Sequence, residues 1–160
     1  MSTIDAPLPS APVVPGAAPH VLLVRAPYYK AVVDGMTHGV DRILREAGAT
    51  YDTLDVVGAF ELAQAIRLVL RGAGRFDGFV ALGCIVRGET DHYDHICRES
   101  MAGLMSVALQ FGLALGTGLL TVHDIAQANE RSGPDGHNKG AEAAVAALRQ
   151  IAVARTLGAA

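Results

Sequence analysis

The chain is poor in aromatic residues and has no excess of basic ones. Phe, Tyr and Trp make up 5% of its 160 residues, and Trp is absent. The formal net charge is −3, and no basic stripe is interleaved with aromatic residues, which argues against a nucleic-acid partner. Hydrophobic residues nevertheless make up 51% of the chain. Small and aliphatic residues must therefore build the core, and one domain of this length can bury it without disulfides.

Cysteine is also scarce. Cys84 and Cys97 form no CxxC pair, and a single pair does not make a disulfide scaffold, so we expect reduced thiols and a cytoplasmic protein. The first 20 residues contain no Lys or Arg and are interrupted by prolines, which excludes a signal peptide and a membrane span there. We predict a flexible Pro/Ala-rich tail at residues 1–19, followed by a single domain at 20–160.

Strand and helix patterns alternate along this domain. Short apolar runs predict strands at 21–24, 50–57, 79–83 and 115–121, and helical spacing predicts helices at 32–47, 60–72, 93–111, 124–131 and 138–157. Such alternation predicts parallel strands with right-handed crossovers. The expected fold is a three-layer α/β/α sandwich with a four-stranded parallel sheet, of flavodoxin-like type. Ligands bind such sheets at the carboxyl ends of the strands.

The segment after the third strand, Gly83 to Asp94, carries the strongest signal for chemistry. Gly88 permits a tight turn, and Thr90 or Asp91 is placed to cap the next helix. Amides at a helix start form a phosphate site, although a capped loop with a polar edge explains the same residues. His92 follows at the mouth of the helix, where it is either a proton-transfer residue or a surface histidine.

The other strand ends offer weaker signals. Tyr28 follows the first strand and suits stacking on a heterocycle or packing at a subunit edge. Glu61, in the segment Gly58–Glu61 after the second strand, could bind hydroxyl groups, but an acidic residue is favoured early in any helix. Arg131, after the fourth strand, could clamp a phosphate or simply favour a helix C-terminus. Glu142 could pair with His92 or with a lysine.

Three segments together resemble the lumazine synthase family: GAFE at 58–61, DGFVALGCIVRGETDHYDHIC at 77–97, and NERSGPDGHNKGAEAAVAAL at 129–148. The resemblance spans residues 20–155. It implies condensation of 5-amino-6-(D-ribitylamino)uracil with 3,4-dihydroxy-2-butanone 4-phosphate to give 6,7-dimethyl-8-ribityllumazine, phosphate and water. This is the penultimate step of riboflavin biosynthesis, and it links the chain functionally to riboflavin synthase. It implies no cofactor and no metal, in keeping with the lack of a metal-ligand motif.

The resemblance also assigns roles to individual residues. It makes His92 the proton shuttle and Arg131 the phosphate-binding cation, with Glu142 as a candidate to orient the histidine. For the pyrimidine and the ribityl chain it implies Tyr28, Gly58, Ala59, Phe60, Glu61, Cys84, Ile85, Val86, Thr117 and Lys139. For the phosphate it implies Arg87, Gly88, Glu89, Thr90 and Arg131.

The sequence departs from the family pattern at several of these places. Pro27, Tyr28 and Tyr29 stand where the family often has Arg-Phe-Asn. Thr117 falls where many members have a phenylalanine, and Asp135 where many have a lysine. These departures bear on substrate affinity more than on the type of reaction.

The resemblance further implies a homo-oligomer. Family sites lie between neighbouring subunits of a pentamer, which stays single, pairs into a decamer, or closes into an icosahedral capsid of sixty subunits. Two other functions remain open from the sequence. One is a flavin or nucleotide carrier of flavodoxin type, which would need a phosphate loop after the first strand. The other is a shell or flavin-binding paralogue that has lost synthase activity.

Overall fold

The computed structural model describes residues 7–72, 75–134 and 137–158, and these residues form four strands and five α-helices. The strands are β1 (His20–Ala26), β2 (Thr50–Asp55), β3 (Gly78–Val86) and β4 (Leu115–Val122). The helices are α1 (Lys30–Glu46), α2 (Leu62–Val69), α3 (His92–Phe111), α4 (Ile125–Ser132) and α5 (Lys139–Thr156). Short 3₁₀ turns at Pro27–Tyr29 and Ala59–Glu61 lead into α1 and α2.

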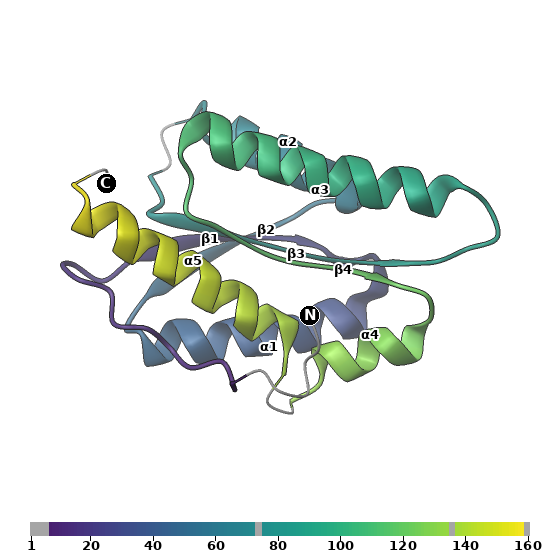
Figure 1. Cartoon of the computed structure of the whole chain (residues 1–160), viewed down its shortest axis with the longest axis horizontal. Coiled ribbons are helices and arrows are strands. Elements are labelled where there is room, and N and C mark those ends of the chain that lie inside the picture. Colours follow the sequence, from purple (N-terminus) through teal and green to yellow (C-terminus); the bar gives the residue numbers. More distant parts are fainter. Residues whose placement is uncertain (1–6, 73–74, 135–136, 159–160) are drawn as a thin grey trace.

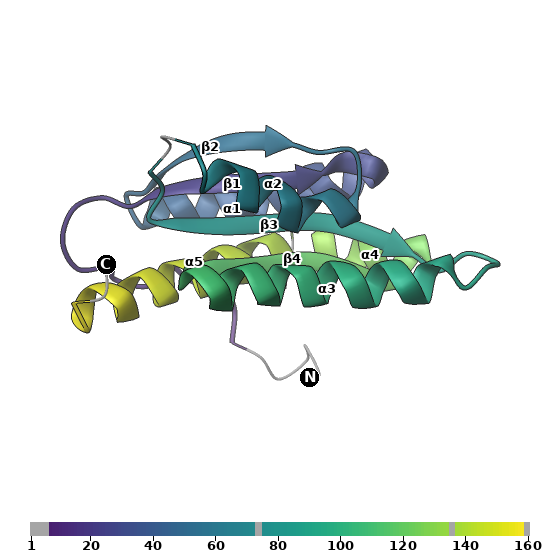
Figure 2. The same ribbon diagram turned by 90° about the horizontal axis from the view of Figure 1, so that it is seen from above.

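All pairings within the sheet are parallel, in the order β2-β1-β3-β4. Helices α2 and α3 cover one face, and α1, α4 and α5 cover the other (Figure 1). Figure 2 shows the same layers from above, with the loop between β3 and α3 extending past the body of the domain. The predicted α/β sandwich with four parallel strands is therefore confirmed. Within the residues described, no helix has the length and apolar character needed to cross a membrane.

The third strand is longer than the sequence predicted. Instead of ending at Gly83, β3 continues to Val86, because its last residues stay in register with β4 from Cys84↔Leu120 to Val86↔Val122. The loop before α3 therefore consists of residues 87–91 alone. The helix predicted at 60–72 is shorter, with only Leu62–Val69 in α-helix.

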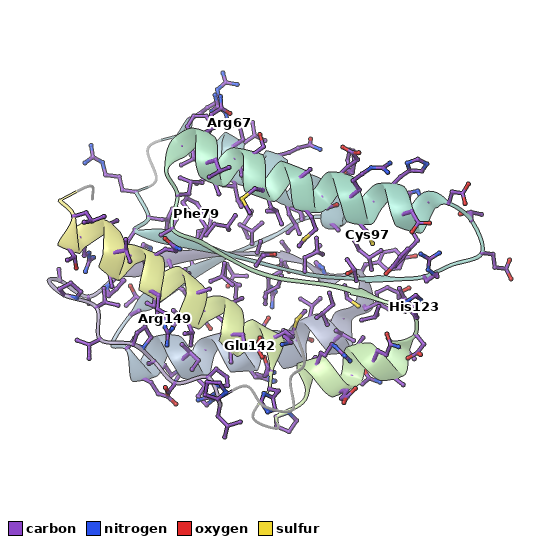
Figure 3. All side chains as sticks on the ribbon, viewed as in Figure 1. Arg67, Phe79, Cys97, His123, Glu142 and Arg149 are labelled. Atoms are coloured by element: carbon purple, nitrogen blue, oxygen red, sulfur yellow. The ribbon has the colours of Figure 1, made fainter. Side chains whose placement is uncertain are left out.

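The core lies on both faces of the sheet. Buried residues of β1 and β3 alternate between the two faces, as expected for a parallel sheet covered on both sides. On one face they pack against α1 and α5, with Met36, Ile43 and Leu148 fully buried. On the other face they pack against α2 and α3, where Phe79 lies between sheet and helices (Figure 3). Both layers are thus anchored on the strands whose ends carry the predicted site.

Helix α5 approaches α1 so closely that glycine is required at their contact. A Cβ atom at Gly140 would lie 2.0 Å from the carbonyl oxygen of Met36, a distance that no side chain can occupy. We expect Gly140→Ala to lower the free energy of unfolding by about 1–3 kcal/mol through overpacking. Thermal denaturation of Gly133→Ala provides the control, since its Cβ would make only an ordinary 3.5 Å contact with Asn129. Equal melting temperatures for the two variants would contradict the close approach.

Residues 7–19 contain no helix or strand, and they contact helices of the same chain. Arg42 donates to the carbonyl oxygen of Pro9 at 3.4 Å, and Arg155 donates to those of Pro15 and Ala17 at 2.8 and 2.6 Å. The tail therefore has bonded contacts with α1 and α5. The flexibility expected from its composition stays a prediction.

Candidate active site

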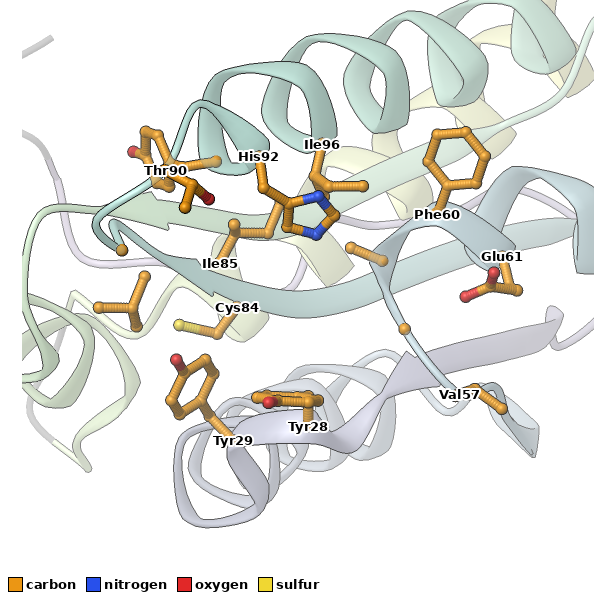
Figure 4. A pocket seen from close by; sticks show the side chains of 15 residues that line it. Tyr28, Tyr29, Val57, Phe60, Glu61, Cys84, Ile85, Thr90, His92 and Ile96 are labelled. Atoms are coloured by element: carbon orange, nitrogen blue, oxygen red, sulfur yellow. The ribbon is translucent and has the colours of Figure 1, made fainter.

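A cavity of about 590 Å³ opens at the carboxyl edge of the sheet. It lies between the segments that follow β1 and β2, the last residues of β3, and the start of α3 (Figure 4). The lining includes eleven of the predicted site residues: Tyr28, Gly58, Ala59, Phe60, Glu61, Cys84, Ile85, Val86, Gly88, Thr90 and His92. Three separate stretches of sequence therefore meet at one cavity, where the fold rule places a ligand.

Two tyrosines form the side of the cavity that follows β1. The ring of Tyr28 is 77% exposed and meets the ring of Tyr29 edge-on, with centroids 5.2 Å apart. Burial, reinforced by the neighbouring Tyr28 and Cys84, raises the pKa of the Tyr29 phenol. Tyr29 therefore stays protonated at neutral pH, while Tyr28 presents an open aromatic surface to a planar ligand.

The segment after β2 forms the opposite side. Gly58 is extended, and the 3₁₀ turn Ala59–Glu61 is closed by a hydrogen bond from the Glu61 N–H to the Gly58 carbonyl at 3.2 Å. This turn sends the Phe60 ring and the Glu61 carboxylate toward the same rim (Figure 4). The sequence allowed Phe60 to be either a core residue or a site residue. In the structure its side chain is half exposed. The rim thus combines an apolar face with one acceptor for hydroxyl groups.

The floor of the cavity is the end of β3. Cys84 is buried there, and burial raises the pKa of its thiol to about 11. Because the neutral thiol is favoured, Cys84 acts as a small apolar wall and not as a nucleophile. Burial also raises the pKa of Cys97, which lies one helical turn beyond Tyr93 on α3.

This pKa gives a chemical test. In a Cys97→Ser background, we expect iodoacetamide to modify Cys84 very slowly at pH 8, where about one thousandth of the thiol is ionised. The rate should rise about tenfold per pH unit toward pH 11. The same protein unfolded in guanidinium provides the control and should react quickly. Rapid modification of the folded protein at pH 8 would show that Cys84 is accessible and ionised.

The start of α3 differs from the sequence prediction in one respect. Asp91 occupies the N-cap position, but no side chain caps the helix there, and Asp91 has helical dihedral angles where a capping residue usually has extended ones. The predicted side-chain cap is therefore wrong. The Asp94 N–H donates to the Asp91 carbonyl at 3.1 Å, so the amides left for a ligand beside Gly88 and Thr90 are those of His92 and Tyr93. The His92 ring points from this helix start into the cavity (Figure 4).

Four further residues line the cavity that the sequence reasoning did not select: Tyr29, Val57, Tyr93 and Ile96. Ile96 could have been found by helical spacing from His92, since residues four positions apart lie on the same side of a helix. Burial, followed by a hydrogen bond with Cys97, raises the pKa of the Tyr93 phenol. Together they make the α3 wall largely apolar around one imidazole.

The remaining predicted residues do not line this cavity: Arg87, Glu89, Thr117, Arg131, Lys139 and Glu142. Arg87 is paired with Asp94, and Glu89 is exposed in the loop. Thr117 is exposed on the edge strand β4, where its hydroxyl accepts from the Leu119 N–H at 3.4 Å. Arg131 donates to the Gln127 carbonyl at 2.9 Å and pairs with Glu130 at 3.1 Å.

Glu142 does not orient His92 within one chain. It pairs with Lys139, one turn earlier on α5, at 2.6 Å. Figure 3 shows Glu142 on α5 and Cys97 on α3, on opposite faces of the sheet. The lysine partner that the sequence left open is thus the one that Glu142 has in this structure. In the described residues, no cluster of three or more His, Cys, Asp or Glu side chains is placed to hold a metal ion.

Fold and cavity define a class: an α/β protein with a cavity at the carboxyl edge of a parallel sheet, lined by aromatic side chains and a histidine. A sequence profile of the family 6,7-dimethyl-8-ribityllumazine synthase matches residues 18–155. The synthase of Paramagnetospirillum magneticum is 46% identical over 144 residues, which cover 86% of this chain and 96% of the relative. The chain belongs to the 6,7-dimethyl-8-ribityllumazine synthase family, which confirms the resemblance found in the sequence.

Two further relatives bear the same name. The synthase of Bartonella tribocorum is 42% identical over 140 residues, covering 88% of this chain and 93% of the relative. The synthase 1 of Rhizobium meliloti is 44% identical over 144 residues, covering 88% of this chain and 94% of the relative. The similarity therefore spans nearly the full length of each protein and is not confined to one shared module.

Proposed function

We propose that this chain condenses 5-amino-6-(D-ribitylamino)uracil with 3,4-dihydroxy-2-butanone 4-phosphate to form 6,7-dimethyl-8-ribityllumazine, phosphate and water. The observation that carries the proposal is the meeting of Tyr28, the Gly58–Glu61 segment and His92 at one cavity next to open helix amides. An aromatic face, a hydroxyl acceptor, a proton-transfer group and an anion site are what this pair of substrates requires. Membership of the family points to the same reaction.

The cavity divides the chemistry between its walls. The pyrimidine stacks on Tyr28, over the neutral strip Cys84–Val86, and Glu61 accepts hydrogen bonds from the ribityl chain. The phosphate lies against Gly88, Thr90 and the amides that begin α3. Held this way, the amine and the ketone react as neighbours, and proximity supplies much of the acceleration.

Each covalent step then moves a proton. The substrate amine adds to the ketone and loses water to give an imine. Elimination expels the phosphate and leaves an enol, which tautomerises to a new carbonyl on the adjacent carbon. The second amine attacks this carbonyl, and loss of a second water closes the ring. His92 is the group on the α3 wall that takes up and returns these protons. Fixed amide dipoles and a cation favour the departure of the phosphate dianion.

The reaction is tested by supplying both substrates and following lumazine absorbance. We expect purified protein to accelerate product formation above the spontaneous rate, with stoichiometric release of phosphate. Adding riboflavin synthase, the enzyme that uses the product, should convert the signal to riboflavin. An intact protein that leaves the spontaneous rate unchanged would refute the synthase function.

The complete site needs a second copy of the chain. Arg131, Lys139 and Thr117 have family roles in substrate binding, yet they do not line the cavity of their own chain. Met101, Met105 and Leu109 also form an exposed apolar row on one side of α3. Burial of this row in a pentamer, with the cations of one subunit reaching the cavity of the next, accounts for both features. Pairs of pentamers or a sixty-subunit shell are larger assemblies of the same unit.

The number of subunits in the assembly can be measured directly. Native mass spectrometry of the wild-type protein should give masses that are multiples of five subunits. Met105→Glu should shift the distribution toward monomers, because a carboxylate would be buried against an apolar surface. Val153→Glu changes an exposed residue of α5 in the same way and serves as the control. A stable wild-type monomer would refute the pentamer.

A further inference from the structure

Arg87 spans the base of the loop between β3 and α3. Its backbone N–H donates to the Val122 carbonyl at 2.9 Å, which extends the bonding between β3 and β4 by one residue. Its side chain crosses to the first turn of α3, where Nη2 lies 2.7 Å from Asp94 Oδ1 and Nη1 lies 3.5 Å from Asp94 Oδ2. The guanidinium carbon also lies 4.4 Å from the centre of the Tyr93 ring. One side chain therefore joins both ends of the segment 87–91.

These contacts leave Arg87 poorly placed to bind phosphate. Both terminal nitrogens of its guanidinium face a carboxylate, and the residue does not line the cavity. The residues that follow it do line the cavity, since Gly88, Thr90, His92 and Tyr93 all contribute to the lining. A change in the Arg87 contacts would therefore move the wall of the cavity without removing any group that touches a substrate.

We propose that Arg87 is a positioning residue, which acts through Asp94 and Tyr93 to fix the loop 87–91 and the start of α3 in the geometry that receives the phosphate. This role rests on the proposed synthase function. It makes Arg87 part of the phosphate site although Arg87 itself does not touch the phosphate. The planar guanidinium is suited to it, because it pairs with a carboxylate through two nitrogens and stacks on an aromatic ring at the same time.

Asp94 decides between positioning and direct binding, because the two roles predict opposite effects. If Arg87 binds phosphate, Asp94→Ala frees its positive charge, and inorganic phosphate should inhibit more strongly. If Arg87 positions the loop, Asp94→Ala removes the partner, and inhibition by inorganic phosphate should weaken about fivefold, as should inhibition of Arg87→Met. KM for the butanone phosphate should rise by a similar factor in both variants, with KM for the uracil substrate unchanged.

Arg87→Lys gives a second comparison. Lysine keeps the charge but loses the two-nitrogen geometry and the planar contact with Tyr93. A positioning role predicts that Arg87→Lys resembles Arg87→Met, whereas direct binding predicts that the lysine restores most of the phosphate affinity. Arg98→Ala is the matched control, since Arg98 is an exposed arginine of α3 that pairs with Glu99. It should leave the phosphate inhibition constant unchanged.

Hydrogen exchange of the intact wild-type and variant assemblies separates this inference from the synthase function. Without substrates, we expect the amides of residues 88–91 to exchange faster in Arg87→Met and Asp94→Ala than in wild type, with Arg98→Ala unchanged. A wild-type protein without synthase activity would refute the function but would not alter this result. Unchanged exchange at 88–91, or tighter phosphate binding in Asp94→Ala, would overturn the positioning role.

Discussion

Replacing His92 with alanine is expected to lower kcat by about 100-fold while changing KM for either substrate little. The imidazole lies on the α3 wall of the cavity, so alanine removes a proton donor and acceptor without altering the stacking surface. Stacking and proximity remain in the variant. We therefore expect a decrease in kcat at the low end of the range for acid–base catalysis. Steady-state kinetics with both substrates varied would measure the two effects separately.

His95→Ala is the control for this experiment. His95 lies three residues further along the same helix and is exposed, where it contacts Arg98 at 3.0 Å outside the cavity. Its removal should leave kcat within about twofold of wild type, because a surface substitution seldom propagates to a site. Unchanged turnover in His92→Ala would show that substrate alignment alone drives the reaction and that His92 carries no proton.

Arg131→Met should raise KM for the butanone phosphate by about 30-fold, because a phosphate that loses its cationic partner in a closed site forfeits a charge-assisted pair. Methionine preserves the length and the apolar stem of the side chain. KM for the uracil substrate should hardly change. Arg149→Met, at an exposed position of α5, is the control. An unchanged KM for the butanone phosphate in Arg131→Met would refute the clamp.

Combining these two variants tests whether the site is shared between chains. His92→Ala and Arg131→Met subunits, unfolded together and reassembled at equal amounts, should form some sites with an intact histidine from one chain and an intact arginine from the next. Random assembly makes about a quarter of the sites intact, so with butanone phosphate well below its KM the activity should exceed that of either variant alone. Activity equal to the average of the two separate variants would mean that each chain completes its own site.

The sequence predicted the order of strands and helices well, because each has a local apolar period and most are bounded by glycine or polar turns. Gly48 illustrates this, since it takes the left-handed conformation (φ 67°) that ends α1. The last residues of β3 were assigned to a loop because their strand state depends on pairing with β4, which no local pattern encodes. The observed end of β3 thus differs from the predicted one because it depends on non-local pairing.

The predicted site residues also fall into two groups, those that local sequence places and those that depend on non-local contacts. Tyr28 after β1, Gly58–Glu61 after β2, and Gly88 and Thr90 before α3 all line one cavity, because parallel strands bring their carboxyl ends to a single edge. Arg87 and Glu142 could not be placed from sequence, since each charged side chain has several possible partners within reach. The structure pairs them with Asp94 and Lys139. Sequence position identifies the edge of the sheet, while the direction of a long side chain depends on its neighbours.

A site shared between two subunits, as proposed above for the cavity and Arg131, has a genetic consequence. In the proposed assembly each subunit takes part in two sites, the one that its Tyr28 and His92 line and the one that its Arg131 would complete. A subunit that carries both defects therefore disables two sites. When such a subunit makes up half of a mixed assembly, about a quarter of the sites stay intact, and not half. A double-defective allele expressed beside the wild-type copy should therefore lower the activity below the half that a null allele would leave.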